Sequence, residues 1–151
     1  LGEVDCGFVI WVRAKRYNIN IEEQLKNSIT NLFQFIEKEV LFLFKPEQII
    51  ILGSVLPTIK DNTSKKLLKG ARSEVNNSQL ERTKLTLKYN EELEKKARKK
   101  GYNYIDITDE TIDKKTNLVS EKFLAKEMHD HHLSNEMSHH LWNQKIISLF
   151  N

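Results

Sequence analysis

Gln48-Ile49-Ile50-Ile51-Leu52-Gly53 is the stretch of sequence that decides the fold of this chain. It is short, almost wholly apolar and rich in β-branched residues, a pattern typical of a parallel strand that is covered on both faces. Pro46 separates this run from the helical pattern before it. Tyr102 to Ile107 is similar in character and predicts a second strand, with Asp106 and Thr108 as polar residues at its carboxyl end.

A long helix is predicted before the first strand. Asn20 followed by Glu23 has the spacing of a capping box, which satisfies free backbone N–H groups at a helix start. Apolar residues then recur at the spacing of one helical face: Leu25, Ile29, Leu32, Ile36 and Val40. The helix is expected to run from about residue 21 to residue 42.

Two further helices follow in the sequence. Ser78 and Glu81 form a second capping box, and Gly101 supplies a left-handed stop, so a helix is predicted over 79–100. Ser134 can cap a final helix. The apolar face of that helix would carry Leu141, Trp142, Ile146 and Leu149.

The alternation of strands and long helices predicts an α/β domain with a mainly parallel sheet between layers of helices. Residues 1–151 are expected to form one domain, within which the polar segment 58–77 is a long surface loop. The periodicity of residues 7–13 favours a strand, while residues 2–5 could be the loop that leaves a strand cut from the chain. We therefore expect the sequence to begin in mid-domain, without the N-terminal strands of the sheet.

Composition limits the function classes. The 151 residues include 39% hydrophobic ones, enough for a core, and the net charge of +3 gives no dominant field for nucleic acid. Cys6 is the only cysteine, so no intramolecular disulfide can form, and a reducing, cytoplasmic setting is expected. No apolar run approaches the roughly 18 residues that span a bilayer, so no membrane association is expected.

All five histidines fall between His129 and His140, and Asp130-His131-His132-Leu133-Ser134 stands just before the final helix. A carboxylate two residues before an imidazole can orient it as a general base, which makes Asp130 and His132 candidate catalytic residues. A helix-capping loop with incidental histidines is the alternative. The histidines could also bind zinc, but a His-Glu-x-x-His pattern and a cysteine pair are both missing, so no metal or other cofactor is predicted.

An ordered set of short motifs resembles the SGNH (GDSL-like) hydrolases. The set runs through nearly the whole chain: Gly2-Glu3-Val4-Asp5-Cys6, Ile51-Leu52-Gly53-Ser54-Val55-Leu56-Pro57, Arg82-Thr83, Tyr89-Asn90 with Leu93, Tyr104-Ile105-Asp106, and Asp130-His131-His132-Leu133-Ser134. The resemblance implies a three-layer α/β/α domain of flavodoxin-like type. It also implies an esterase or deacetylase that acts on acyl esters, often of carbohydrates.

The resemblance assigns roles to several residues. His132 would take the proton of a serine nucleophile, and Asp130 would fix the tautomer of His132. Gly2, Glu3 and Asp5 match the block that lines the oxyanion pocket, although Val4 stands where the family has the hydrogen-bonding asparagine. The block that carries the nucleophile in the family has no counterpart in the sequence.

Other candidates come from residue chemistry alone. Ser54 follows the first strand and could be the nucleophile, but the chain runs on into a loop rather than a helix, which favours a turn hydrogen bond. Arg13 and Arg82 could organise the pocket or hold an anion, because guanidinium presents a planar fork of donors. Cys6 beside Asp5 is a poor thiolate, since a neighbouring carboxylate raises a thiol pKa.

Two functions from other classes compete with the esterase. One is a non-catalytic carbohydrate-binding or interaction module that keeps the fold, and the other is a metal protein that uses the histidine cluster. The expected partner is a small ester or carbohydrate substrate. If N-terminal strands are absent, the exposed sheet edge is expected to be covered by a homo-oligomer or by a substantial rearrangement.

Overall fold

The computed structural model describes residues 2–151 and contains both helices and strands. Strand β1 (Ile50–Leu52) pairs in parallel with β2 (Asn103–Ile105), with Ile51 opposite Tyr104. Both strands predicted from the sequence are therefore confirmed, although each is shorter than its apolar run. Beyond β1, the N–H of Gly53 still donates to the carbonyl of Ile105 over 2.9 Å.

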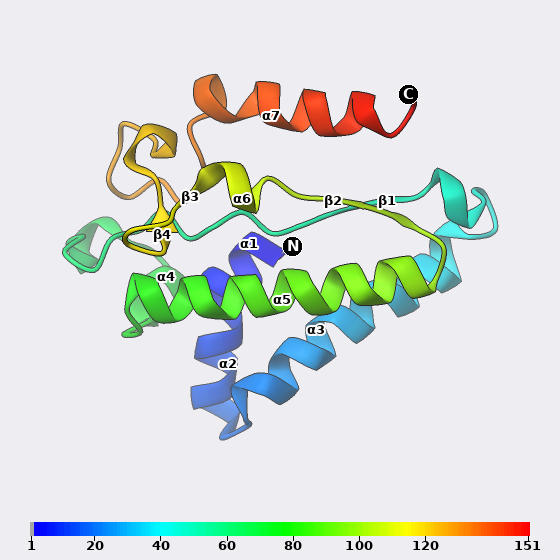
Figure 1. Ribbon diagram of the computed structural model, residues 1–151. Coiled ribbons are helices and arrows are strands. Elements are labelled where there is room, and N and C mark those ends of the chain that lie inside the picture. Colours follow the sequence, from blue (N-terminus) through cyan, green and yellow to red (C-terminus); the bar gives the residue numbers. More distant parts are fainter. Residues whose placement is uncertain (1) are drawn as a thin grey trace.

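Helices lie on both sides of this strand pair (Figure 1). Helices α3 (Ile21–Phe35) and α5 (Gln79–Lys99) lie below it in the view, and α7 (Asn135–Ser148) lies above it. The connection from β1 to β2 passes through α5, so it is a crossover of the kind that joins parallel strands. The predicted mixture of parallel strands and helices is confirmed at this level.

The predicted helix over 21–42 is confirmed, and its last part is a π-helical turn, Ile36–Val40. Asn20 caps the helix as expected, but its side chain accepts a hydrogen bond from the N–H of Glu22, at 2.7 Å. Glu23 is exposed and makes no return bond to Asn20 within the described chain. The cap is therefore present without the full capping box.

The helix predicted over 79–100 is α5. The hydroxyl of Ser78 accepts from the N–H of Glu81, and the carboxylate of Glu81 accepts from the N–H of Ser78, which completes the capping box. Gly101 has a φ of +74°, which is the left-handed stop expected from the sequence. This helix contributes the side chains of Leu85, Tyr89 and Leu93 to the core.

The strand predicted over residues 7–13 is wrong, because this part of the chain is helical. Its elements are α1 (Gly2–Val4), a π-helical turn (Asp5–Val9) and α2 (Ile10–Tyr17). Cys6, Ile10 and Ala14 are four residues apart, lie on one side of these turns and are buried. Burial of that face against the core outweighs the β-propensity of the β-branched residues between them.

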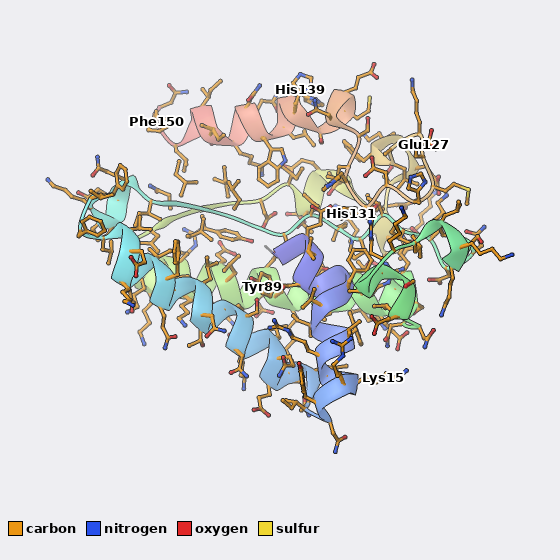
Figure 2. All side chains as sticks on the ribbon, turned by 180° about the vertical axis from the view of Figure 1, so that it is seen from behind. Lys15, Tyr89, Glu127, His131, His139 and Phe150 are labelled. Carbon is orange, nitrogen blue, oxygen red and sulfur yellow. The ribbon has the colours of Figure 1, made fainter. Side chains whose placement is uncertain are left out.

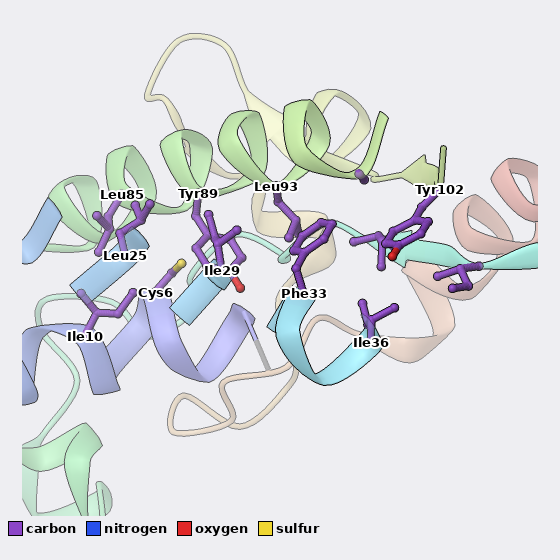
Figure 3. Close-up of a cluster of buried hydrophobic side chains, with 13 residues drawn as sticks. Cys6, Ile10, Leu25, Ile29, Phe33, Ile36, Leu85, Tyr89, Leu93 and Tyr102 are labelled. Atoms are coloured by element: carbon purple, nitrogen blue, oxygen red, sulfur yellow. The ribbon is translucent and has the colours of Figure 1, made fainter. Parts of the chain in front are cut away.

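The largest core cluster fills the space between the N-terminal helices, α3, α5 and the sheet (Figure 3). The rings of Phe33 and Tyr102 stack with their centroids 5.8 Å apart. Tyr89 is almost fully buried, and burial raises the pKa of its hydroxyl to about 12. The buried members of the cluster are Cys6, Ile10, Leu25, Ile29, Phe33, Ile36, Ile49, Ile51, Leu85, Tyr89, Leu93, Ala97 and Tyr102.

A second, smaller cluster lies under α7. Leu56, Val119 and Phe123 are its buried members, and Leu141 of α7 packs against them. Of the apolar face predicted for α7, Ile146 is exposed, while the other three side chains are partly buried. Ser134 precedes the helix as expected, but its side chain makes no capping hydrogen bond.

Short elements join these parts. They are the 3-10 turns Pro46–Gln48, Lys65–Leu67 and Glu121–Phe123, the helices α4 (Ala71–Glu74) and α6 (Thr108–Thr111), and the antiparallel strands β3 (Ile112–Asp113) and β4 (Leu118–Val119). The predicted loop 58–77 is mostly irregular, as expected, but Thr58, Ile59 and Thr63 within it are buried. None of the helices in residues 2–151 has the length and apolar character needed to cross a membrane.

Candidate functional site

The segment 130–134 is held by backbone contacts on both sides. The hydroxyl of Thr58 donates to the carbonyl of Asp130 over 3.1 Å, which ties the segment to the loop after β1. The N–H of Ser134 donates to the carbonyl of Phe123 over 2.8 Å. The loop after β1 and the turn Glu121–Phe123 thus fix the place of His131 and His132 between them.

Asp130 acts on the backbone of the segment. Its Oδ1 accepts a hydrogen bond from the N–H of His132 over 3.0 Å, which makes a local turn. The sequence predicted that this carboxylate would meet the imidazole of His132. The structure gives that carboxylate the backbone N–H instead, so Asp130 shapes the loop that presents the ring.

The carboxylate beside the imidazole is that of Glu3. Its Oε2 lies 3.4 Å from Nδ1 of His132, although the two residues stand near opposite ends of the chain. The other oxygen, Oε1, is buried and has no hydrogen-bond partner within residues 2–151. Burial raises the pKa of Glu3, and the interaction with His132 works in the opposite direction. The ring of His132 is exposed and its Nε2 makes no hydrogen bond within the described chain.

His131 connects this pair to the loop 58–77. Its ring lies 3.9 Å from the ring of His132 between centroids, and Phe8 packs against it edge-on at 5.9 Å. Nδ1 of His131 lies 3.2 Å from Nη1 of Arg72. Burial lowers the pKa of His131, His132 and Arg72 lower it further, and Asp130 works in the opposite direction.

Four of the five histidines form two separate pairs, His131 with His132 and His139 with His140. His131 lies beside the N-terminal helices in Figure 2, whereas His139 projects from α7 at the upper edge of the molecule. Nδ1 of His139 lies 2.9 Å from the carbonyl oxygen of Asn135, and the rings of His139 and His140 meet edge-on. The closeness of the five residues in sequence therefore does not produce one metal-binding cluster.

A smaller set of ligand types does come together. Glu3, His131 and His132 each offer one ligand atom, and these atoms lie within 4.8 Å of one another. Carboxylate and imidazole are suitable ligands for a divalent metal. A metal held there would occupy a nitrogen of His132 and would compete with its use as a base.

Gly2 and Ser54 touch each other beside this pair. A Cβ on Gly2 would lie 2.8 Å from Cβ of Ser54 and 2.9 Å from Cε1 of Tyr89, so only glycine fits without movement. The side chain of Asn90 binds the backbone of Ser54, accepting from its N–H at 2.7 Å and donating to its carbonyl at 2.8 Å. The Ser54 hydroxyl is nearly buried and is directed to the carbonyl of Val55 at 3.4 Å, and within residues 2–151 it makes no hydrogen bond to a histidine.

Asp5 and Arg13 lie at a different cavity. Together with residues of α3 they line a space of about 320 Å³, which does not include the histidines. The carboxylate of Asp5 accepts a hydrogen bond from the hydroxyl of Ser28 over 2.7 Å. The sequence grouped both residues with the pocket of His132, and the structure does not bring them to it.

Arg82 is a structural residue in this fold. Its guanidinium is buried and donates to the carbonyls of Ile59, at 2.6 Å, and Asn77, at 3.3 Å. The carboxylate of Asp61 lies 3.7 Å away. These contacts hold the two ends of the loop 58–77 against α5.

Sequence reasoning missed Arg72 and Phe8 as neighbours of the candidate site. Arg72 stands in the polar loop, where no periodicity marks it, and only the folded chain brings it to His131. Phe8 lies in the segment that was predicted as a strand. Its position four residues before Val12 was a helical signal, but the β-branched residues around it obscured that signal.

Comparison of the chain with protein-family models, with curated proteins and with solved structures finds no significant match.

Proposed function

We propose that this protein is an SGNH-type ester hydrolase or deacetylase that acts by serine acyl transfer on an acylated carbohydrate or another small ester. The observation that carries the proposal is the pairing of Glu3 Oε2 with His132 Nδ1 at 3.4 Å. A carboxylate on one nitrogen of an imidazole fixes its tautomer and leaves the other nitrogen to accept a proton. The exposed ring of His132 is placed to do so.

The chemistry follows from this arrangement. The serine oxygen attacks the carbonyl carbon of the ester while Nε2 of His132 takes the hydroxyl proton. The carbon–oxygen bond to the alcohol then breaks, and the alcohol leaves with that proton. Water attacks the acyl-serine by the same route, which releases the acid and restores the serine. Glu3 stabilises the imidazolium of His132 during both steps, and Asp130 holds the backbone that presents the ring.

Ser54 is the serine that the sequence offers as a nucleophile. It lies against Gly2, next to Glu3, but its hydroxyl is directed to the carbonyl of Val55. Attack by Ser54 would require its side chain to rotate towards His132. A variant of Ser54 therefore separates this serine from any other source of the nucleophile.

The proposal also includes a specific fold and a cellular setting. We infer a three-layer α/β/α domain in which β1 and β2 belong to a mainly parallel, flavodoxin-like sheet. The layers of helices on both sides of these strands support this inference (Figure 1). A cytoplasmic setting is supported by the single cysteine, which is free and buried.

A non-catalytic carbohydrate-binding or interaction module is the second candidate. The buried hydroxyl of Ser54 favours it, because a nucleophile must reach its substrate. Such a module would bind its ligand without turnover. The change His132→Ala would leave that binding unaffected.

Hydrolysis of 4-nitrophenyl acetate by the wild-type chain, His132→Ala and Ser54→Ala tests the proposal, with His140→Ala as a matched exposed-histidine control. The proposal expects turnover that survives in the control and in the presence of a chelator, and that falls by at least about a hundredfold in His132→Ala. Loss in Ser54→Ala as well would identify the nucleophile. Absence of turnover, or equal turnover in His132→Ala and His140→Ala, would favour the binding module.

A further inference from the structure

We infer that the cavity beside His131 is an oxyanion-binding site centred on Arg72, which takes a carboxylate or phosphate group of the ligand. The cavity has a volume of about 380 Å³ and lies between the loop 58–77, the first turn of α5 and Phe8. Arg72 and Arg82 both line it, together with Lys60 and Lys65. Four cationic side chains thus border one space.

Arg72 is the cation that remains available to a ligand. Within residues 2–151 its hydrogen bonds all involve Nη1, which lies 3.2 Å from Nδ1 of His131 and 3.5 Å from the carbonyl of His129. No carboxylate of these residues lies within 4 Å of its guanidinium. The other N–H groups of an arginine can bind two oxygens of a planar or tetrahedral oxyanion.

The other charges around the cavity are already engaged. Lys60 pairs with Glu121 at 2.7 Å, Lys65 donates to the side-chain carbonyl of Asn76, and Arg82 donates to backbone carbonyls. The acidic group of Asp61 accepts from the N–H of Gln79 and lies near Arg82. The remaining acidic group, that of Glu81, is bound in the cap of α5. An anion that entered could therefore bind Arg72 without breaking an ion pair.

A buried hydroxyl adds an independent sign of a ligand. Thr63 lines the same cavity, its side chain is 7% exposed, and its Oγ1 has no hydrogen-bond partner within the described chain. Burying a polar group without a partner is unfavourable, so such groups are normally satisfied. Oγ1 is itself enclosed, so an oxyanion in the cavity would accept this hydrogen bond after the Thr63 side chain turns towards it.

The place of the site suggests its use. Arg72 touches His131, and the ring of His131 lies 3.9 Å from that of His132 between centroids. If the protein hydrolyses esters, the anion would be part of the substrate, so the preferred substrate would be an ester that carries a carboxylate or phosphate. This last step rests on the proposed function, whereas anion binding itself does not.

Titration of the isotope-labelled protein with inorganic phosphate, followed by NMR at constant ionic strength, tests the binding site. Saturable shifts at Arg72 and His131 are expected, and Arg72→Gln should weaken phosphate binding about tenfold or more. Arg98→Gln is the matched control, because Arg98 is exposed at the far end of α5 and pairs with Glu94. Thr63→Val, which keeps the shape of the side chain, should weaken binding by a smaller factor.

Absence of saturable shifts, or equal phosphate binding by Arg72→Gln and Arg98→Gln, would overturn the inference. A second arm compares hydrolysis of 4-nitrophenyl acetate with that of the succinate half-ester of 4-nitrophenol. A preference for the anionic ester that disappears in Arg72→Gln supports the substrate role. Phosphate binding without hydrolysis of either ester would refute the proposed function but support the anion site. Hydrolysis without phosphate binding would support the proposed function but refute the anion site.

Discussion

Oε2 of Glu3 and Nδ1 of His132 lie 3.4 Å apart, so the first turns of the chain and the loop before its last helix share one candidate site. Glu3 is partly buried, its second oxygen has no hydrogen-bond partner among residues 2–151, and its first oxygen pairs with His132. Asp130, the carboxylate nearest in sequence, binds the backbone instead. The pairing is therefore a product of the tertiary fold.

Glu3→Gln should reduce kcat for ester hydrolysis by about a hundredfold, with little change in KM. The amide keeps the shape of the side chain but cannot stabilise the imidazolium of His132 by charge. Steady-state kinetics measure the effect, and Glu136→Gln, in the exposed first turn of α7, is the control. Equal rates for the two variants would show that Glu3 has no part in the reaction.

Cys6 should resist thiol reagents while the protein is folded. Burial raises the pKa of its thiol well above 9.0, and Asp5 raises it further, so little thiolate forms at pH 8. We expect labelling by a thiol reagent to be slow in buffer and complete in denaturant. Because the unfolded thiol ionises at lower pH than the folded one, stability should also fall as the pH rises above about 9. Rapid labelling of the folded chain would contradict this burial.

Asn90→Ala should lower the free energy of unfolding by about 2–5 kcal/mol. The side chain of Asn90 satisfies both the N–H and the carbonyl of buried Ser54, and alanine would leave these two groups without partners. Urea denaturation measures the loss. Asn143→Ala, at an exposed position of α7, should change stability by no more than about 0.5 kcal/mol. A similar small change for Asn90→Ala would mean that the pairing with Ser54 is not needed.

Two glycine substitutions should have opposite effects. A Cβ on Gly53 would lie 2.4 Å from Cβ of Asp106 and 2.6 Å from the hydroxyl oxygen of Tyr104, so Gly53→Ala should destabilise the fold by about 1–3 kcal/mol. A Cβ on Gly7 would meet nothing within 4 Å, and its helical position favours alanine by about 0.5–1 kcal/mol. Thermal unfolding of both variants compares them, and a stable Gly53→Ala would show that Gly53 does not approach Asp106 and Tyr104 this closely.

The long helices could be predicted because their signals are local. The capping box of Ser78 and Glu81 and the stop at Gly101 lie at the ends of α5, and both work as their chemistry dictates. The parallel pairing of the two strands also followed from their apolar runs. The prediction for the N-terminal segment was wrong because Val9, Ile10 and Val12 favour a strand locally. The helix forms because it buries Cys6, Ile10 and Ala14 on one face.

The candidate site could be predicted only in part. His132 and Glu3 were both named from the sequence as candidate site residues. Their pairing was not predicted, because no local pattern relates residues at opposite ends of a chain. Arg13 and Arg82 were chosen for the chemistry of guanidinium, which does not reveal where a side chain lies. Arg72 has the same chemistry and reaches His131 only through the course of an irregular loop.

The most direct test of the account is the reaction of the protein with a fluorophosphonate, which adds covalently to an activated serine. One adduct per chain, located on a serine by mass spectrometry, is expected, and it should form at least about a hundredfold more slowly in His132→Ala. Labelling at the same rate in the wild-type chain and in His132→Ala, or no serine adduct at all, would contradict the proposal that His132 activates a nucleophile.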